Sequence, residues 1–408
     1  MRGLSWIAAL GLWAATIVVA FAIGRNTSAP GVAPAPEDLG AAMRSALAEG
    51  DALERTAQTV QLLEHLDPET LPGVVAVYDQ SIEILDEQDI RPFITAWTRF
   101  DPAGALDHAL TWPHRKREAG VDAAIYGWAQ RDPLSARLAA AQVASDYPAL
   151  AETALFRLFA GWIHSGQDGL DRHILELPTG AQDSAIGVAI GALMRKGGAD
   201  ATLAWASAIL QDESYGDRFK LWVFRRATRS VARSDPERGA AWALQHAGND
   251  YAIDGPRLVA EQWSEQDGLA AIEWLRDQPE SEQRDRAVRD AFLGWLRSDP
   301  QSARAWLEGD TLTPFHDQAI DVFAKRLADR KPVQAIAWCE HITDPKRRNG
   351  CLKVAASGWY QRDAVAAEAW LQDSPLDEEM RSQVRELPEQ RRRRPGGARP
   401  RAAQGAGS

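Results

Sequence analysis

The amino-acid sequence lacks the short motifs that mark the commonest kinds of active site. It contains no G-x-S-x-G, no P-loop and no G-x-G-x-x-G, and the pair Gly197-Gly198 is not followed by Lys and Ser or Thr. Its eight histidines include no H-E-x-x-H and no other ligand pair at helical spacing. Carboxylates are numerous, but without a visible pocket they are typical of helix caps and solvated faces. We therefore predict no catalytic residue, no cofactor and no enzyme activity.

Cysteine is nearly absent, since the chain has only Cys339 and Cys351. With His341 these residues would give three zinc ligands, and the missing fourth ligand disfavours a metal site. Cys339 is expected at the end of one helix and Cys351 in the next, and adjacent antiparallel helices bring such positions within disulfide reach. A disulfide between them would close a short loop between repeats and suits an exported protein. Two buried free thiols are the alternative.

Positive charge is in deficit, because 46 Lys and Arg stand against 57 Asp and Glu, for a net charge of −11. This balance disfavours a general nucleic-acid binder. The exception is the C-terminal end, where residues 391–408 hold six arginines and no acid, so the rest of the chain carries −11 − 6 = −17. We predict a disordered basic tail over residues 386–408. Such a tail can touch anionic lipid headgroups or an acidic partner, or be a merely solvated end.

Charge is missing altogether from residues 3–24. As a helix this run would reach about 33 Å, enough to cross a bilayer core, so residues 1–25 are predicted to be a transmembrane signal-anchor. The alternative is a cleaved signal peptide with a small-x-small site at Ala20-Phe21-Ala22. Residues 26–36 read as a Pro/Ala-rich linker. The predicted location is a bacterial-type inner membrane, with a single pass and the bulk of the chain in the periplasm, and the inverted, cytoplasm-facing topology is the rival.

What the chain does have is a recurring phrase, best preserved from Trp295 to Trp306 as W-L-R-S-D-P-Q-S-A-R-A-W. Asp299 can accept hydrogen bonds from free N–H groups of a first helical turn, and Pro300 fits the first helical position without loss. Proline also disfavours helix at the residue before it. The phrase therefore predicts one helix that ends near Trp295, a tight turn, and a second helix that begins at once.

The phrase repeats at nearly constant spacing. With Trp295 as position zero, the equivalents follow at steps of 31 to 37 residues, five of them 32, and form a zero column of Trp97, Trp128, Trp162, Met194, Val231, Trp263, Trp295, Leu327 and Trp359. Four residues later lie the predicted turn caps Asp101, Asp132, Asp235, Asp267, Asp299 and Asp363. Eight residues after position zero comes an alanine column of Ala105, Ala136, Ala271, Ala303, Ala335 and Ala367. Eleven residues after it comes a second tryptophan column of Trp205, Trp242, Trp274, Trp306, Trp338 and Trp370.

A fixed period of this length indicates a repeat architecture in which each unit is a helical hairpin. One hairpin cannot bury its apolar face alone, whereas stacked neighbours bury a continuous core. We therefore predict that the tryptophans fill this core and that the alanines allow close approach of helices. Ligand-stacking platforms are the alternative for the tryptophans.

These W-x3-D-P-x2-A-x2-W repeats resemble tetratricopeptide-like and Sel1-like α/α solenoids over roughly residues 50–380. They depart from the tetratricopeptide pattern, because the tryptophan lies at the end of the first helix and the period is nearer 32 than 34. The resemblance implies an all-α fold, a right-handed α/α superhelix, with diverged capping helices over residues 37–86 and about nine hairpin repeats over residues 87–385. It also implies a scaffold or adaptor that binds a protein or peptide. An accessory helical domain of a murein-related cell-envelope enzyme complex is the second hypothesis.

The least regular part is residues 162–231, where Ser165-Gly166-Gln167-Asp168-Gly169 and Lys196-Gly197-Gly198-Ala199-Asp200 replace the Asp-Pro turn. Insertions in solenoids often map to loops on the binding face. Neutral drift in a tolerant loop is the alternative.

Overall fold

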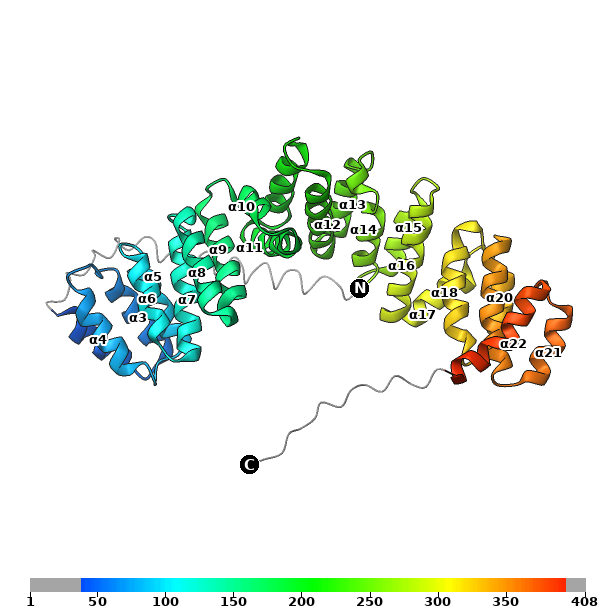
Figure 1. Ribbon diagram of the computed structural model, residues 1–408, viewed down its shortest axis with the longest axis horizontal. Helices are drawn as coiled ribbons and strands as arrows, with labels where there is room; N and C mark the ends of the chain where they lie inside the picture. The colour runs from blue at the N-terminus through cyan, green and yellow to red at the C-terminus, as the bar shows by residue number, and fades with distance from the viewer. Residues whose placement is uncertain (1–37, 394–408) are drawn as a thin grey trace, which may run out of the picture. The chain divides into compact units, whose positions relative to one another are not determined.

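The computed structural model describes residues 38–393, with side chains to residue 386. Every regular element in that range is a helix and no strand occurs there, so the predicted all-α class is confirmed for these residues. The chain divides into two compact units, with the boundary between residues 168 and 169. Figure 1 labels the helices.

Unit 1 begins with α2, and the helices that follow it form successive hairpins of two helices each. Its helices are α2 (Leu39–Leu47), α3 (Ala52–Leu63), α4 (Leu71–Ser81), α5 (Glu87–Trp97), α6 (Pro102–Thr111), α7 (His114–Ala129), α8 (Pro133–Asp146) and α9 (Ala151–Ser165). We call α3, α5, α7 and α9 first helices and α4, α6 and α8 second helices. Each first helix packs against the next first helix, and α6 and α8 pack against the first helix that follows them. Figure 1 shows these helices side by side in chain order.

Unit 2 opens with the short α10 and continues the same alternation. Its helices are α10 (Leu170–Glu176), α11 (Thr179–Gln211), α12 (Asp217–Ser234), α13 (Pro236–Gln245), α14 (Gly255–Trp263), α15 (Gly268–Arg276), α16 (Glu282–Ser298), α17 (Pro300–Gly309), α18 (Asp317–Ala328), α19 (Pro332–Glu340), α20 (Pro345–Tyr360), α21 (Ala364–Asp373) and α22 (Glu378–Arg393). First helices α12, α14, α16, α18 and α20 contact one another in sequence, and α22 packs against α20.

The six aspartates predicted as turn caps all cap second helices. Each accepts a hydrogen bond from the backbone N–H three residues on, over 2.9 to 3.1 Å: Asp101, Asp132, Asp235, Asp267, Asp299 and Asp363. Asp67 forms the same contact with the N–H of Thr70 at 2.8 Å, at the turn between α3 and α4. The first described hairpin therefore begins within the region predicted to be only a diverged cap.

Glycine replaces the Asp-Pro turn in the irregular stretch. Gly166 and Gly169 adopt φ values of 73° and 99°, in the left-handed region that glycine enters without steric cost. Within α11 the backbone leaves helical geometry at Gly197 and Gly198, which has φ 62°, so α11 is two helices joined at a kink. The turn about four residues after Trp162 and Met194 is thus still present, but glycine forms it in place of Asp-Pro. This part of the chain contains short helices and tight turns rather than a long insertion loop.

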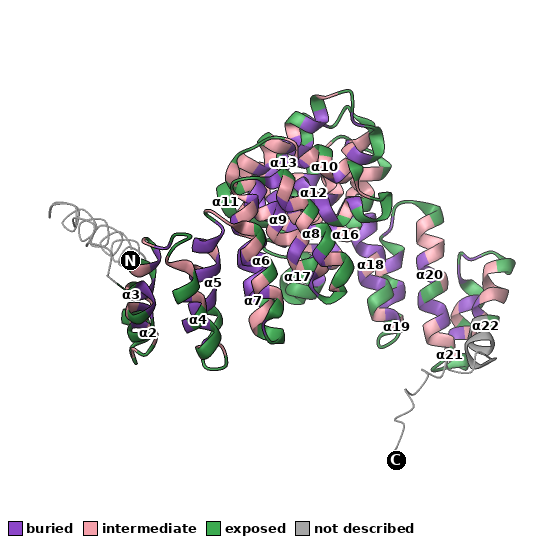
Figure 2. Cartoon of the chain, turned by 60° about the vertical axis from the view of Figure 1, so that its left-hand side comes forward, coloured by how far each residue is buried: buried purple, intermediate pink, exposed green. Residues whose placement is uncertain are grey.

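The core follows the sequence columns. The six residues of the alanine column are fully buried. A further buried column, which the repeat phrase did not include, is the residue directly after the second tryptophan position. Five of its members are no more than 1% exposed: Ala206, Leu275, Leu307, Cys339 and Leu371. Figure 2 shows buried residues along the helix sides and exposed residues at the turns. Burial of this kind, repeated in each hairpin, supplies the apolar area that one hairpin lacks.

Glycine also sets how closely successive first helices approach. A Cβ placed on Gly161 would lie 2.6 Å from the carbonyl oxygen of Tyr126, and one on Gly358 would lie 2.6 Å from that of Ala328. Gly127 and Gly294 approach Thr98 and Ser264 in the same way. Each of these glycines directly precedes position zero of its own repeat. It packs against a residue that lies within two positions of position zero in the preceding repeat. First helices therefore pack on one another in a constant register, within both unit 1 and unit 2.

Two predictions about the ends of the chain need correction. No helix among residues 38–393 combines the length and apolar composition needed to span a bilayer, and the predicted inner-membrane, periplasm-facing location is therefore withdrawn. The run 3–24 and the linker 26–36, from which that location was predicted, lie outside the described residues. Residues 386–393, predicted as the start of the disordered tail, belong to the helix α22, and residues 394–408 lie outside the described residues.

Candidate functional site

None of the twelve predicted tryptophans is exposed. Four are buried (Trp97, Trp162, Trp242 and Trp295), and the other eight are half-buried. Where both columns carry tryptophan, the two rings of one hairpin pack together, with centroids 6.0 Å apart for Trp263 and Trp274 and for Trp295 and Trp306, and 6.5 Å apart for Trp359 and Trp370. Such tilted pairs are a favourable arrangement for aromatic rings. These ring pairs join the two helices of a hairpin.

The two cysteines have a structural role as well. Cys339 in α19 and Cys351 in α20 form a disulfide, with an S–S distance of 2.06 Å and Cα atoms 5.6 Å apart. Both residues are buried, so the bond joins one hairpin to the next inside the core. The buried disulfide therefore offers no surface for a ligand.

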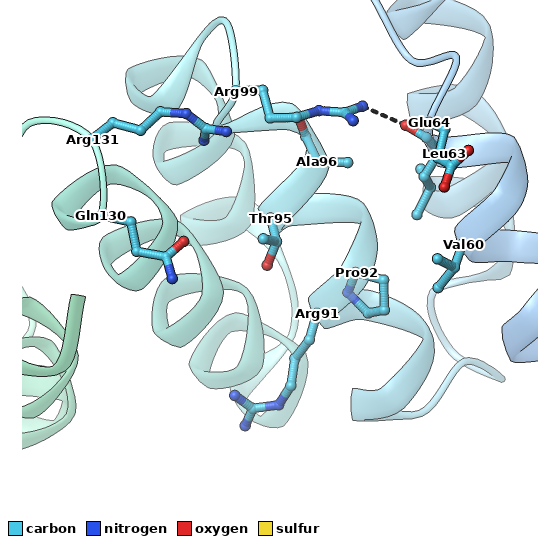
Figure 3. Close-up of a pocket in the computed structure, with 10 residues that line it drawn as sticks. All are labelled: Val60, Leu63, Glu64, Arg91, Pro92, Thr95, Ala96, Arg99, Gln130 and Arg131. Atoms are coloured by element: carbon cyan, nitrogen blue, oxygen red, sulfur yellow. Dashed lines mark hydrogen bonds between the residues drawn. The ribbon is translucent and has the colours of Figure 1, made fainter. Parts of the chain in front are cut away.

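An open groove lies instead on the first helices of unit 1. It has a volume of about 470 Å³ and is lined by Val60, Leu63, Glu64, Arg91, Pro92, Thr95, Ala96, Arg99, Gln130 and Arg131. Figure 3 shows that these residues come from three successive hairpins, with α3 on one side, α5 in the middle and the end of α7 on the other side. The packing of α3 on α5 and of α5 on α7 positions them.

One wall of the groove is apolar. Val60 on α3 leaves 44% of its surface exposed, although it is an aliphatic residue, while Leu63 and Ala96 beneath it are buried. Pro92 lies inside α5 and faces Val60 across the groove in Figure 3. Proline within a helix removes one backbone hydrogen bond and lowers the stability of the helix. The need to pack α5 therefore does not explain why proline occupies this position.

Two arginines at the rim are fixed by the protein itself. Arg99 lies just after α5, and its guanidinium donates to the carbonyl oxygens of Leu63, the last residue of α3, and of Leu66 beyond it, and to that of Ala96 in α5 at 3.0 Å. Arg91 pairs with Glu87 at 3.1 Å and with Asp122 in α7. Arg91 and Arg99 therefore hold the three helices together and keep their positive charges at fixed places beside the groove.

Asp122 extends this ion-pair network to the next hairpin. Its carboxylate is 6% exposed and also binds Arg157 in α9. Burial lowers the pKa of Arg157 from its ordinary value. The shared carboxylate thus links α5, α7 and α9 through ion pairs with two arginines, and these charges stabilise the packing of the helices.

Gln130 and Arg131 differ from the fixed arginines. The side-chain amide of Gln130 and the guanidinium of Arg131 make no hydrogen bond or ion pair with any residue in the range 38–386. Arg131 is held only through its backbone, since its carbonyl accepts a hydrogen bond from Gln167 at 3.0 Å. These two side chains can donate to a ligand without losing an existing partner.

Two hollows in unit 2 have a different character. One, of about 600 Å³, lies between the start of α12 and residues 248–251 and carries both acidic and basic side chains. The other, of about 450 Å³, lies over the turns before α15 and α17, where Asp267 and Asp299 already cap helices. Neither is lined by an excess of basic side chains, as the groove of unit 1 is.

None of the residues that line this groove was predicted from the sequence to bind a ligand. Arg91 and Thr95 are four residues apart and so share one side of α5, away from the side that carries Ile90, Ile94 and Trp97. Arg99 follows at the same spacing just after the helix ends, so the signal was present in the sequence as R-P-x-x-T-x-x-x-R. Whether these residues line a groove depends on how neighbouring hairpins are aligned, and the repeat phrase does not specify that alignment.

The described residues also contain no group of three His, Cys, Asp or Glu side chains placed to hold a metal ion. The geometry of the groove thus defines a candidate binding surface built from charge, an apolar wall and free hydrogen-bond donors. Comparison of the chain with models of known families, with curated proteins and with solved structures found no match.

Proposed function

We propose that this chain is a scaffold of tetratricopeptide-like helical hairpins, an α-solenoid that winds as a right-handed α/α superhelix within each unit. It acts by binding a segment of another protein, not by catalysis. The constant register of the first helices supports this architecture, because Gly161 and Gly358 meet the preceding repeat in the same way. Stacked hairpins leave extended side surfaces open, which suits recognition of a chain segment.

The observation that carries the proposal is the groove on α3, α5 and α7. Its walls are fixed by the contacts of Arg91 and Arg99, whereas Gln130 and Arg131 have unused donors. A preformed concave site loses little conformational entropy when it binds, and a few unpaired polar groups beside an apolar wall orient the ligand.

Site-specific crosslinking of the full chain tests this function. A photoreactive benzoylphenylalanine replaces Thr95, in the middle of the groove, and in a matched control it replaces Arg115, which is exposed in the first turn of α7. In an extract of the cells that produce the protein, we expect discrete adducts with one or a few proteins from position 95 and none of these from position 115. Failure to form any protein adduct at position 95, or identical adducts at both positions, would contradict the proposal.

A further inference from the structure

We infer that the groove of unit 1 binds an acidic segment of a partner protein that also carries one aliphatic side chain. This inference rests on the proposed function and specifies the chemistry of its ligand. Among the residues that line the groove, Arg91, Arg99 and Arg131 are basic and only Glu64 is acidic. When the ion-pair partners Glu87, Asp122 and Arg157 are included, the excess is 4 − 3 = 1 positive charge, and Arg131 is the arginine that has no ion-pair or hydrogen-bond partner for its side chain among the described residues. The whole chain carries −11, so this local excess runs against the overall balance.

Arg131 is the residue expected to bind the carboxylate of the ligand. Its guanidinium is exposed and makes no hydrogen bond or ion pair within the described part of the chain, and the amide of Gln130, which has none there either, precedes it. A guanidinium presents parallel N–H groups that match the two oxygens of a carboxylate, and such charge-assisted bonds are stronger than neutral ones. Arg91 and Arg99 add positive potential from fixed positions, but their donors already serve Asp122, Glu87 and backbone carbonyls.

The apolar wall accounts for the second part of the ligand. Val60 and Pro92 face each other between α3 and α5, on the far side of Thr95 from Arg131 in Figure 3. An aliphatic side chain of the ligand would cover the exposed surface of Val60, which is 44% of that residue. The segment would therefore lie across α5, with its aliphatic side chain near α3 and its acid near the end of α7.

Other anionic or internal occupants fit less well. A nucleic acid would bring many phosphates close to a chain whose net charge is −11, and only one of the three guanidiniums is free to bind them. The basic end of this chain, residues 391–408, would be repelled by Arg99 and Arg131. Charge complementarity thus favours an acidic polypeptide.

Fluorescence anisotropy with defined peptides tests the inference on the full chain. The probe is a short labelled peptide of Asp and Glu with one central Leu, compared with a peptide that has Lys in place of every acid and one that has Ser in place of Leu. We expect the acidic leucine peptide to bind, with an affinity that falls as salt is added because the contact is electrostatic. The serine peptide should bind more weakly, and the lysine peptide should not bind.

Charge reversal at one residue supplies the decisive comparison. Arg131→Glu should weaken binding of the acidic leucine peptide by about tenfold or more, the loss expected when a charge-assisted hydrogen bond is removed. It should also allow the lysine peptide to bind, which a merely unfolded variant would not do. Arg115→Glu makes the same charge change at the other end of α7, outside the groove, and should leave the affinity within about twofold, since an exposed charge at that distance is screened.

Several outcomes would overturn the inference. Equal weakening by Arg131→Glu and Arg115→Glu would show that only net charge matters. Tighter binding of a single-stranded oligonucleotide than of the acidic peptide, lost in Arg131→Glu, would assign the groove to a nucleic acid. Adducts from position 95 with a partner segment that has no acidic residue would overturn the charge assignment and leave the scaffold function standing. Absence of both adducts and peptide binding would remove both proposals.

Discussion

At the scale of single residues, the tryptophans of the repeat link neighbouring helices. The ring of Trp306 in α17 lies 5.8 Å from Phe292 and 6.0 Å from Trp295, both in α16, and 4.8 Å from His316, which directly precedes α18. One side chain thus contacts its own hairpin and the start of the next. The loss of this contact is expected to spread, because each hairpin depends on its neighbours for burial.

Trp306→Ala should lower the free energy of unfolding by about 3–5 kcal/mol, since it leaves a large gap among aromatic rings. Urea denaturation of the full chain, followed by circular dichroism, measures this loss. Leu138→Ala is the control, because Leu138 is 67% exposed and its removal should change stability by less than about 0.5 kcal/mol. A loss below about 1 kcal/mol for Trp306→Ala would mean that the ring is not a core residue.

His246 is a second residue whose environment has a measurable consequence. It is 8% exposed, its Nδ1 contacts the hydroxyl of Tyr251 at 3.1 Å, and its Nε2 is buried without a hydrogen-bond partner among the described residues. Burial lowers the pKa of His246 from its ordinary value near 6.5. The unfolded chain therefore takes up the proton more readily than the folded chain does.

The sign of the pH effect follows from that difference. Stability is complete above the unfolded pKa of about 6.5 and falls as the pH drops from there toward the lower folded pKa. Between pH 7.5 and pH 5 the wild type should thus lose more stability than His246→Phe, in which the ring no longer titrates. His114→Gln, at an exposed position, should retain the pH dependence of the wild type. Identical pH profiles for wild type and His246→Phe would refute the assignment.

At the scale of helices, the spacing between hairpins depends on glycine. Gly358 in α20 meets the backbone of Ala328 at the end of α18, and a backbone atom cannot move aside as a side chain can. A methyl group there must push two first helices apart. The contact recurs at Gly161 in unit 1, so the same test applies in both units.

Gly161→Ala and Gly358→Ala should each destabilise the chain by about 1–3 kcal/mol, the usual cost of overpacking a core. Gly191→Ala is the matched control inside α11, where an added Cβ meets only the flexible end of Arg195 at 3.6 Å. That change should stabilise the protein by about 0.5–1 kcal/mol, because alanine favours the helix. Thermal unfolding measures all three variants, and stabilisation by Gly358→Ala would contradict the close approach.

The disulfide provides a covalent link between α19 and α20. Cys339 and Cys351 are 12 residues apart, and a loop of that length is predicted to contribute about 3 kcal/mol by restricting the unfolded chain. The double variant Cys339→Ala, Cys351→Ala should lose roughly this amount in urea denaturation. Reductant should destabilise the wild type and leave the double variant unchanged. A wild type that is equally stable with and without reductant would show that the link contributes nothing.

The helices and their starts could be predicted from the sequence because their causes are local. Asp299 and Pro300 specify a helix start by their own side chains, and Trp295 and Trp306 report the period. The groove could not be predicted in the same way. Gln130 and Val60 are far apart in the chain and meet only because α3, α5 and α7 pack in a particular register. That register is set by contacts such as Gly127 on Thr98, which a repeat phrase of Trp, Asp, Pro and Ala does not contain.

At the scale of the whole molecule, stability depends on one capping contact used in both units. The carboxylate of Asp132 in unit 1 accepts hydrogen bonds from the hydroxyl and backbone N–H of Ser135, and Asp299 in unit 2 accepts the same bonds from Ser302. These bonds favour the charged carboxylate and lower the pKa of Asp132 and Asp299 below the ordinary value. The two units should therefore respond alike when their caps are protonated.

Acid should weaken both units together for this reason. Because the folded pKa values lie below the unfolded value of about 3.9, the contribution of these caps is present above pH 4 and is lost as the pH falls through the folded values. Urea denaturation at pH 5 and pH 3 should show a smaller acid-induced loss in the double variant Ser135→Ala, Ser302→Ala than in the wild type, since without the hydroxyls the two pKa values return toward normal. Ser45→Ala, at an exposed position in α2, should behave as the wild type does. If the double variant and the wild type lose the same stability between these pH values, the serine hydroxyls do not set the charge state of the caps.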